Sequence, residues 1–391
     1  MTSGDVTSGE VTSGRVTSGD VTPPESPGDG GPDDWSGRFV QQAVLCADLG
    51  SPLYDRLLRL LADDCARRGA TWDLVEPRAE LRFGQAGALR LLGAAHRLAL
   101  SGAADGWASV LPSCGGAVPD DDGDLWASWT DLVRTHGPEL TAGLGREVQT
   151  NEVGRSAGLG LALARAAAER DGVRWRLVEL GCSGGLNLRL DRFRIVFAGD
   201  DGPLVLGAGS SDGVEVSSSV VDGESLPPTM QLPEVSERIG LDPHPIDVAT
   251  EDGALTLLSF VWPDQSARLA RLRSAIEVAR AVPAEIRSVS DTASALAETL
   301  SVVPAEHAGT AVMHSVVWQY IPVEQRWRIT EALEAAGEQA SEERPLAWIR
   351  FEPDEWDRRR AAVWLRTWPD GRDSLVAHTD FHGRWIRPFP A

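Results

Sequence analysis

The residues best placed to do chemistry form one short segment, Glu179-Leu180-Gly181-Cys182-Ser183-Gly184-Gly185. It ends the mostly apolar run Trp175–Leu180, which predicts a buried strand. Glycines directly after a strand permit positive φ angles and let the backbone approach a ligand closely. The short helix expected next would offer unpaired amide groups at its N-terminus. The segment therefore predicts a ligand-binding loop at the carboxyl end of a strand, where open α/β sheets bind their ligands.

The same segment also spells G-x-S-x-G, the pattern around the nucleophile of α/β-hydrolases. Ser183 would be that nucleophile, and the other triad members would follow in the correct chain order from Asp264 or Asp291 and from His378 or His382. Glu179 argues against a hydrolase, because such an enzyme needs no charge just before the turn. No His-Gly-Gly-Gly segment of the oxyanion type lies upstream. The serine hydrolase stays open as an alternative.

Alternating strands and helices are expected to position this loop from residue 149 onward. Apolar runs predict strands at 235–241, 286–289, 311–317 and 346–351, and a final strand pair at 362–368 and 374–379. Helical spacing predicts helices at 151–170, with Asn151 as N-cap, and at 266–280, 292–300 and 323–336. This alternation predicts an α/β fold whose Rossmann-like, mostly parallel sheet has helices on both faces. Residues 192–234, rich in Gly, Ser, Asp and Val, interrupt it and predict a β-hairpin insertion.

Two further regions precede the predicted Rossmann-like domain of residues 149–391. Residues 1–34 repeat a VTSGD-like pentad and then become rich in Pro, Gly and Asp. They lack aromatic residues until Trp35 and predict a disordered tail. Residues 35–148 have helical periodicity, with Ser51-Pro52 as an N-cap and first helical residue. This helical region is expected to act as a lid on the substrate side.

Composition narrows the classes of ligand. The formal net charge of −21 argues against nucleic acid and against an anionic membrane surface as partners. We expect a small-molecule substrate, and the negative field favours a neutral or cationic one. The four cysteines form no CxxC pair, so no metal site is expected. The N-terminus resembles no secretory signal and no apolar stretch is long enough to span a bilayer, which predicts a cytoplasmic protein.

Ordered motifs around the glycine loop resemble those of class I S-adenosylmethionine-dependent methyltransferases. Glu179–Gly185 resembles their first motif, an acidic residue followed by a glycine-rich turn, with Ser183 where a middle glycine is common. Residues 237–243 resemble the second motif, 289–291 the third, and 312–322 the fourth strand with the segment after it. The resemblance implies S-adenosylmethionine as cofactor, with Gly181, Ser183 and Gly185 beneath it. It also implies that Asp242 holds the ribose hydroxyls, that Asp291 faces the adenine amine and that Ser315 lies in the cofactor site.

The spacing departs from the methyltransferase pattern at one point. Glu179 and Asp242 are 63 residues apart, whereas the acidic residue usually follows such a glycine loop by roughly 20 residues. The insertion predicted at 192–234 would account for the difference.

From about Trp35 onward the chain is also similar to an uncharacterised bacterial family, domain of unknown function 2332. The phrases that carry this similarity are residues 148–155, 179–187, 261–265 and 314–320. Membership implies the Rossmann-like fold and supplies no established activity.

Polar and aromatic residues near the predicted strand ends are candidates for catalysis and for substrate binding. His314 ends a predicted strand and is the candidate general base, because imidazole titrates near neutral pH. The substrate-side candidates are Asn151, Glu152, Arg155, Asn187, Asp264, Trp318 and Tyr320. Each has a structural alternative: capping and solvation for the polar ones, helix-dipole stabilisation for Asp264, and core packing for the aromatic ones.

The sequence therefore predicts a methyltransferase-like enzyme that acts on a small molecule. The alternatives are a non-catalytic or other nucleotide-binding Rossmann-like protein and the Ser183 hydrolase.

Overall fold

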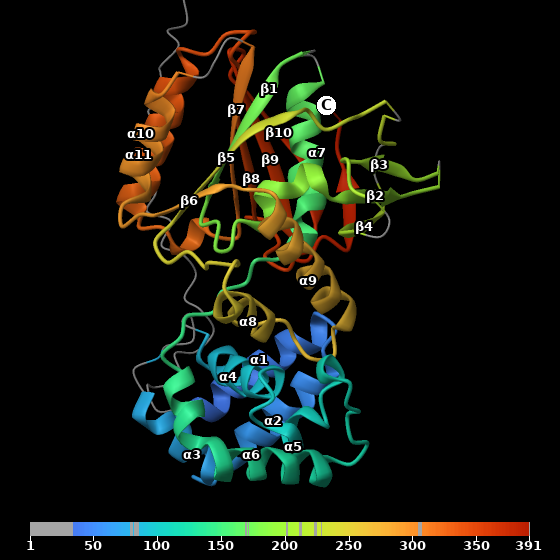
Figure 1. The fold of residues 1–391 in the computed structure, drawn as a ribbon, viewed down its shortest axis with the longest axis vertical. Coiled ribbons are helices and arrows are strands. Elements are labelled where there is room, and N and C mark those ends of the chain that lie inside the picture. The colour runs from blue at the N-terminus through green and yellow to red at the C-terminus, as the bar shows by residue number, and fades with distance from the viewer. Residues whose placement is uncertain are drawn as a thin grey trace, which may run out of the picture.

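The structure is a computed structural model that describes residues 34–78, 81, 86–168, 170, 172–200, 202–210, 213–222, 225–227, 229–303 and 307–390. The low-complexity segment predicted to be disordered lies outside these residues, except for Asp34. A helical lobe and a larger lobe built on one sheet make up the molecule (Figure 1). None of the described helices is long and apolar enough to cross a membrane.

The helical lobe confirms the helical region that the sequence predicts at its N-terminus. Its helices are α1 (Trp35–Asp48), α2 (Pro52–Ala66), α3 (Ala70–Val75), α4 (Gly87–Leu100), α5 (Asp105–Ala108) and α6 (Asp122–Gly143), with short 3-10 turns η1 (Glu76–Arg78) and η3 (Pro112–Cys114). Buried aromatic and aliphatic side chains such as Phe39, Leu57 and Trp129 fill its core. Trp262, from far along the chain, packs into the same core.

The start of α2 shows how the two lobes are joined. Ser51 caps the helix, its Oγ accepting from the Tyr54 amide at 3.3 Å, and Pro52 is the first helical residue, as predicted. Asp264 of the larger lobe also binds here, since its carboxylate accepts from Ser51 Oγ at 2.7 Å and from the Leu53 amide at 2.9 Å. The sequence offers Asp264 as a substrate-side candidate, with stabilisation of the helix that follows it as the structural alternative. Asp264 stabilises the N-terminus of α2 instead.

The larger lobe is a mixed α/β structure with a single sheet of eleven strands in the order β3-β2-β4-β11-β10-β9-β8-β7-β1-β5-β6. The strands nearest the glycine loop, β1 (Arg174–Leu180), β5 (Val235–Asp242), β6 (Glu285–Ser288), β7 (Ala308–Ser315) and β8 (Leu346–Pro353), are parallel to their neighbours in that group. The meander β9 (Ala361–Trp368), β10 (Arg372–Thr379) and β11 (Trp385–Pro388) is antiparallel. The predicted strand pair at the end of the chain is β9 and β10.

The segment predicted as a β-hairpin insertion extends the sheet at its far edge. β2 (Arg194–Ala198) and β3 (Leu204–Leu206) do form an antiparallel hairpin. β4 (Glu215–Val220) then lies parallel to β2 and to β11, which joins the hairpin to the main sheet. The expected appendage is therefore an integral edge of the sheet, because β11 supplies a free edge for it.

Helices cover both faces of the sheet (Figure 1). α7 (Ser156–Ala167) and α9 (Ser266–Ala281) contribute to one apolar core, and α10 (Thr292–Ser301) and α11 (Val323–Gly337) contribute to the other. α8 (Glu251–Ser259) contacts α4 of the helical lobe. The predicted helix at 151–170 begins later than expected, because residues 153–155 form a 3-10 turn (η4, Val153–Arg155) and Glu152, not Asn151, caps it.

Candidate functional site

The glycine loop lies at the carboxyl end of β1, which is central in the parallel part of the sheet between β5 and β7. Gly181, Ser183 and Gly185 all have positive φ, at +64°, +52° and +65°. Ser183 adopts this conformation despite its Cβ, which L residues do at a cost of roughly 1–2 kcal/mol. A Cβ on Gly181 would come within 2.3 Å of Val317 Cγ2. Alternating left-handed residues thus turn the chain sharply against the segment after β7.

Asp242 joins this loop in space although it is far from it in sequence. Parallel pairing sets Leu180 beside Leu241, so Asp242 comes level with the start of the loop. Its Oδ2 accepts from the Ser183 amide at 2.8 Å, and its Oδ1 accepts from the His244 amide at 2.8 Å. The intervening chain forms the distant edge β2–β3–β4 and returns to β5, which is the physical reason for the long spacing.

The predicted helix after the loop is a 3-10 helix, η5 (Leu186–Arg192). Its first amide, Leu186 N–H, donates to Asn151 Oδ1 at 3.0 Å. That amide is therefore unavailable to a ligand, which corrects the expectation of an open helix N-terminus. Asn151, a substrate-side candidate in the sequence, instead holds the loop in place.

Glu179 is a buried carboxyl group with unused hydrogen-bonding capacity. It is 2% exposed, and its Oε2 has no partner among the described residues. Burial raises the pKa of Glu179 to about 8, although a hydrogen bond with Asn187 and the nearby Arg189 lower it in part. Asn187 is itself fixed, since its Oδ1 accepts from Ser156 Oγ at 2.9 Å. Near neutral pH the Glu179 carboxyl group is therefore uncharged, and a cationic group bound next to it would favour its ionisation.

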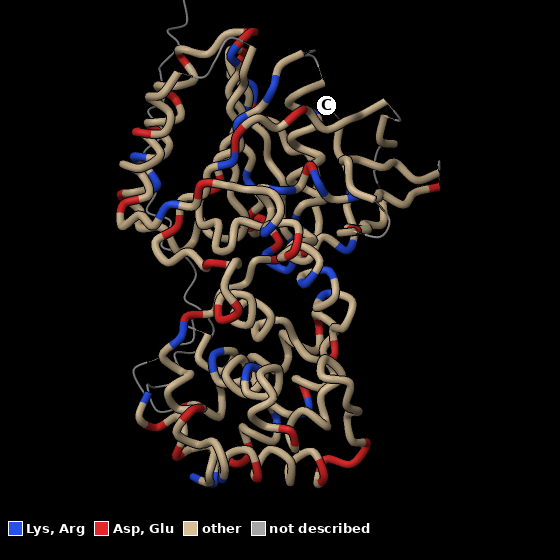
Figure 2. Tube along the Cα trace, in the orientation of Figure 1, with Lys and Arg blue, Asp and Glu red and all other residues tan. Residues whose placement is uncertain are grey.

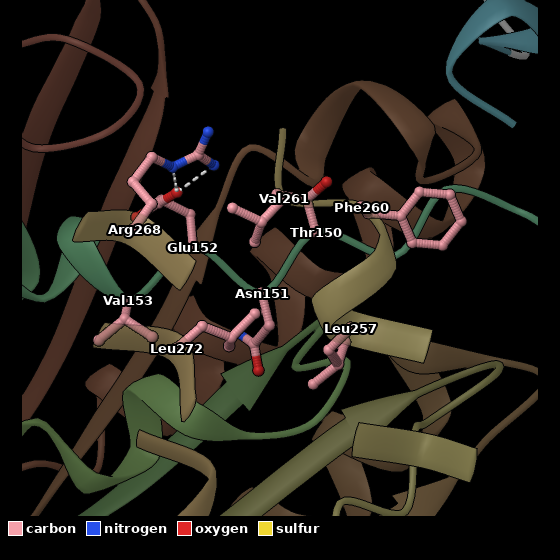
Figure 3. A pocket seen from close by; sticks show the side chains of 9 residues that line it. All are labelled: Thr150, Asn151, Glu152, Val153, Leu257, Phe260, Val261, Arg268 and Leu272. Carbon is pink, nitrogen blue, oxygen red and sulfur yellow. Dashed lines mark hydrogen bonds and ion pairs between the residues drawn. The ribbon is translucent and has the colours of Figure 1, made fainter. Parts of the chain in front are cut away.

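Glu152 and Arg268 form a buried ion pair close to the loop (Figure 3). Arg268 Nε donates to Glu152 Oε2 at 2.8 Å, and the Gly154 amide donates to Oε1 at 2.9 Å. Burial alone would raise the pKa of Glu152, but Arg268, His382 and Arg271 hold it well below its usual range. The hollow beside this pair has a volume of only about 10 Å³, so it has room for one water molecule at most. Glu152 is therefore a structural anion and not a free substrate ligand.

Arg155 is buried, and burial lowers its pKa. Its Nη1 donates to the Ser315 carbonyl at 3.0 Å and to Ser315 Oγ at 3.3 Å, and its Nε donates to the Phe381 carbonyl at 3.2 Å. These bonds tie the end of β7 to the turn after β10.

A cavity of about 680 Å³ opens where the two lobes meet, at the carboxyl ends of β1, β5 and β7. Its size is that of a small-molecule site. The sheet lobe contributes predicted residues Arg155, Gly181, Ser183, Asp242, Ser315 and Tyr320. The helical lobe contributes Tyr54, Ala86, Leu89, Arg90 and Gly93. The structure thus brings the loop, the end of β5 and the helical lobe together around one space.

Other predicted site residues lie elsewhere. His314 is 1% exposed and does not line the cavity. Its Nδ1 bonds Glu352 Oε1 at 2.7 Å, and its ring stacks on Trp318 with centroids 4.8 Å apart. Asp291 caps α10, accepting from the Ala293 amide at 3.1 Å, and its hydrogen bond with Arg328 lowers its pKa to about 2. The positions of these residues therefore do not support the predicted roles. These roles were a general base for His314, stacking on a ligand for Trp318 and an adenine contact for Asp291.

Cavity residues that sequence reasoning did not assign to any site include His244, Trp262 and Arg268, whereas His382 was named only as a triad candidate of the alternative hydrolase. Trp262 and His382 contact edge to face, with ring centroids 6.1 Å apart. Burial, and then Arg268, lower the pKa of His382 to about 4. His244 directly follows the second motif, which was a usable signal, whereas Arg268 lies on α9 with no motif around it.

The hydrolase triad is not assembled. Ser183 Oγ has no hydrogen-bond partner among the described residues. Asp264 accepts hydrogen bonds at the start of α2, and Asp291 caps α10. His378 pairs with Asp354 at 3.2 Å. His382 lines the same cavity as Ser183, but neither candidate acid contacts it in the described part of the chain.

The family described as "uncharacterized protein conserved in bacteria (DUF2332)" matches residues 36–387. The chain belongs to this family. The match spans both lobes, so the helical lobe and the sheet lobe are parts of one family unit. No curated protein and no solved structure matches the chain.

Proposed function

We propose that the protein is a Rossmann-like, S-adenosylmethionine-dependent methyltransferase that acts on a small molecule. The observation that carries the proposal is the loop of alternating positive-φ residues at the end of β1, bonded through Ser183 to Asp242 of the adjacent strand, with both facing one cavity. The parallel order β6-β5-β1-β7-β8 supports it, because it places the loop centrally, where the ends of neighbouring strands converge.

The residues of the loop suit the cofactor at its methionine and ribose ends. Glu179 does not line the cavity itself but lies two residues before Gly181, and its buried Oε2 has no partner among the described residues. It would accept from a cationic amino group that reaches past the loop. Each carboxylate oxygen of Asp242 accepts one amide, which leaves lone pairs for ribose hydroxyls. A side chain at Gly181 would intrude toward Val317. S-adenosylmethionine would supply the activated methyl group, and the chain would bind and align it.

The adenine end would be held differently from the pattern that the resemblance implies. Asp291 is engaged in capping α10 and lies outside the cavity. Pro243, Val316 and Val317 line the cavity next to the loop and would flank an adenine ring by apolar contact. The acceptor would lie toward the helical lobe, against Tyr54 and Trp262. Alignment of methyl and acceptor at about 3–3.5 Å would supply most of the acceleration.

Calorimetric titration of S-adenosylhomocysteine into the full chain tests the proposal. We expect micromolar binding to the wild type and a loss of about tenfold or more in Glu179→Gln, which keeps the shape of the side chain but cannot ionise. Asp291→Asn is the matched control, and it should bind like the wild type, because the Asp291 carboxylate caps α10 and pairs with Arg328 instead of meeting the cavity.

No binding at millimolar ligand, by folded protein, would refute the cofactor assignment. Binding of ATP or NAD in its place would favour a different nucleotide-binding function. Labelling of Ser183 by a fluorophosphonate, abolished in Ser183→Ala, would favour the hydrolase.

A further inference from the structure

Arg155 differs from the other ionised groups around the cavity. It is 9% exposed, it lines the cavity, and no carboxylate lies within ion-pair distance of it among the described residues. Its hydrogen bonds go to two carbonyls and one hydroxyl. Arg268, by contrast, is neutralised by Glu152. A buried cation without a counter-ion is costly, and an anionic ligand would remove that cost.

The carboxylates around Arg155 do not provide that counter-ion. Glu152, Glu352 and Glu179 act on it only through space. Glu152 is paired with Arg268, and Glu352 Oε1 bonds His314 and accepts from the Val317 and Trp318 amides. Glu179 holds its proton up to about pH 8. The guanidinium therefore lines the cavity without a directly bonded counter-ion among the described residues.

Two hydroxyl groups line the same cavity as this cation. Ser183 is 6% exposed, lines the cavity, and has an Oγ without a partner among the described residues. Ser315 Oγ accepts from Arg155, so its own hydrogen is free to be donated into the cavity that it also lines. A planar guanidinium and hydroxyl donors that line one cavity are groups suited to binding a carboxylate.

We propose that Arg155, with the hydroxyls of Ser183 and Ser315, forms a carboxylate-binding site in the wall of the cavity, so that a ligand of this protein carries a carboxylate. The overall charge of −21 pointed to a neutral or cationic ligand. Acidic residues are indeed spread over both lobes (Figure 2). In the wall of the cavity, however, Arg155 favours an anionic group. This site goes beyond the proposed cofactor, because its carboxylate can belong to the methionine end of that cofactor or to a second substrate.

The test compares ligands with and without a carboxylate on wild type and Arg155→Met. S-adenosylhomocysteine carries the amino-acid end, and 5′-methylthioadenosine lacks it. If the cofactor is the source, Arg155→Met lowers the affinity for the first by about tenfold or more and leaves the second unchanged. Malonate is the second probe, read as a rise in the melting temperature. If a second substrate is the source, that rise is lost in Arg155→Met and persists in wild type saturated with S-adenosylhomocysteine.

Arg176→Met is the matched control. Arg176 is also a buried guanidinium bonded to a carbonyl and a hydroxyl, Val302 O and Thr310 Oγ1, but it does not line this cavity. The Arg176→Met variant measures how much stability the protein loses when a buried guanidinium is removed away from the cavity. If Arg155→Met fails to fold, Ser183→Ala keeps the guanidinium and should still weaken the same carboxylate probes several-fold.

The malonate measurement stands even if S-adenosylhomocysteine does not bind, so failure of the cofactor proposal and failure of this one are distinguishable. Equal responses of wild type, Arg155→Met and Ser183→Ala to every carboxylate probe would overturn the carboxylate site.

Discussion

Replacing Glu179 by glutamine should make the protein more stable, and increasingly so as the pH rises. Glu179 is 2% exposed, and burial raises its pKa from the ordinary value of 4.5 to about 8. The folded chain therefore holds this proton to a higher pH than the unfolded chain does. The stabilising contribution of the proton is complete below pH 4.5, and it is lost as the pH rises through about 8.

The magnitude follows from the linkage between proton binding and folding. A shift from 4.5 to about 8 corresponds to a total penalty of roughly 5 kcal/mol at high pH, at about 1.4 kcal/mol for each pKa unit. About half of it, 2–3 kcal/mol, develops between pH 6 and pH 9. Glutamine preserves the hydrogen-bonding shape and cannot ionise, so the variant should escape this loss.

Urea denaturation at pH 6, 7, 8 and 9 measures the effect as the difference between wild type and Glu179→Gln. Using the difference removes contributions that the two proteins share, such as His96, whose pKa is lowered to about 4 by burial. If the free energies of unfolding of the two proteins changed in parallel from pH 6 to pH 9, the account of Glu179 as a buried, protonated acid would be refuted. Saturating S-adenosylhomocysteine should reverse the order of stability, because its amino group would ionise the carboxyl group.

Three further predictions concern packing and charge. Asp264→Ala should lower the free energy of unfolding by about 1–2 kcal/mol, because α2 loses the acceptor for Ser51 Oγ and for the amide of its second residue; a loss below 0.3 kcal/mol in urea melts would contradict this role. Gly181→Ala should destabilise by at least about 1 kcal/mol, since its φ is +64° and its Cβ would come within 2.3 Å of Val317 Cγ2. Val317→Ala should recover part of that loss in the double variant, and strict additivity would argue against the contact. His96→Gln should reduce acid sensitivity between about pH 6.5 and pH 4, because the buried imidazole, with its pKa near 4, must stay neutral in the folded state; thermal melts across that range measure the difference.

Local patterns in the sequence were sufficient for much of the fold. The apolar run at 235–241 and the helical spacing at 323–336 correspond closely to β5 (Val235–Asp242) and α11 (Val323–Gly337). Ser51-Pro52 fixed the start of α2. These features depend on side-chain periodicity and on capping within a few residues, which the sequence carries directly.

Site residues were harder to predict from the sequence, because a residue belongs to the site only if its side chain also points toward the cavity. His314 was chosen because it ends a strand, but side chains alternate across a sheet. Val312, two residues earlier, belongs to the core with α10 and α11, whereas Ser315 lines the cavity on the other side. His314 and Ser315 are neighbours in the sequence, yet His314 is buried and stacks on Trp318, whereas Ser315 lines the cavity.

By itself the sequence determined the glycine loop, the strand before it and the capped helices, since these are local properties. Only the tertiary structure decided which distant groups meet that loop. The edge strands β2–β4 send the chain away and return Asp242 to Ser183, and the packing of the helical lobe closes the cavity. The charge that Arg155 presents there was invisible in a chain of net charge −21, because an electrostatic environment is set by neighbours in space, and burial strengthens their effect.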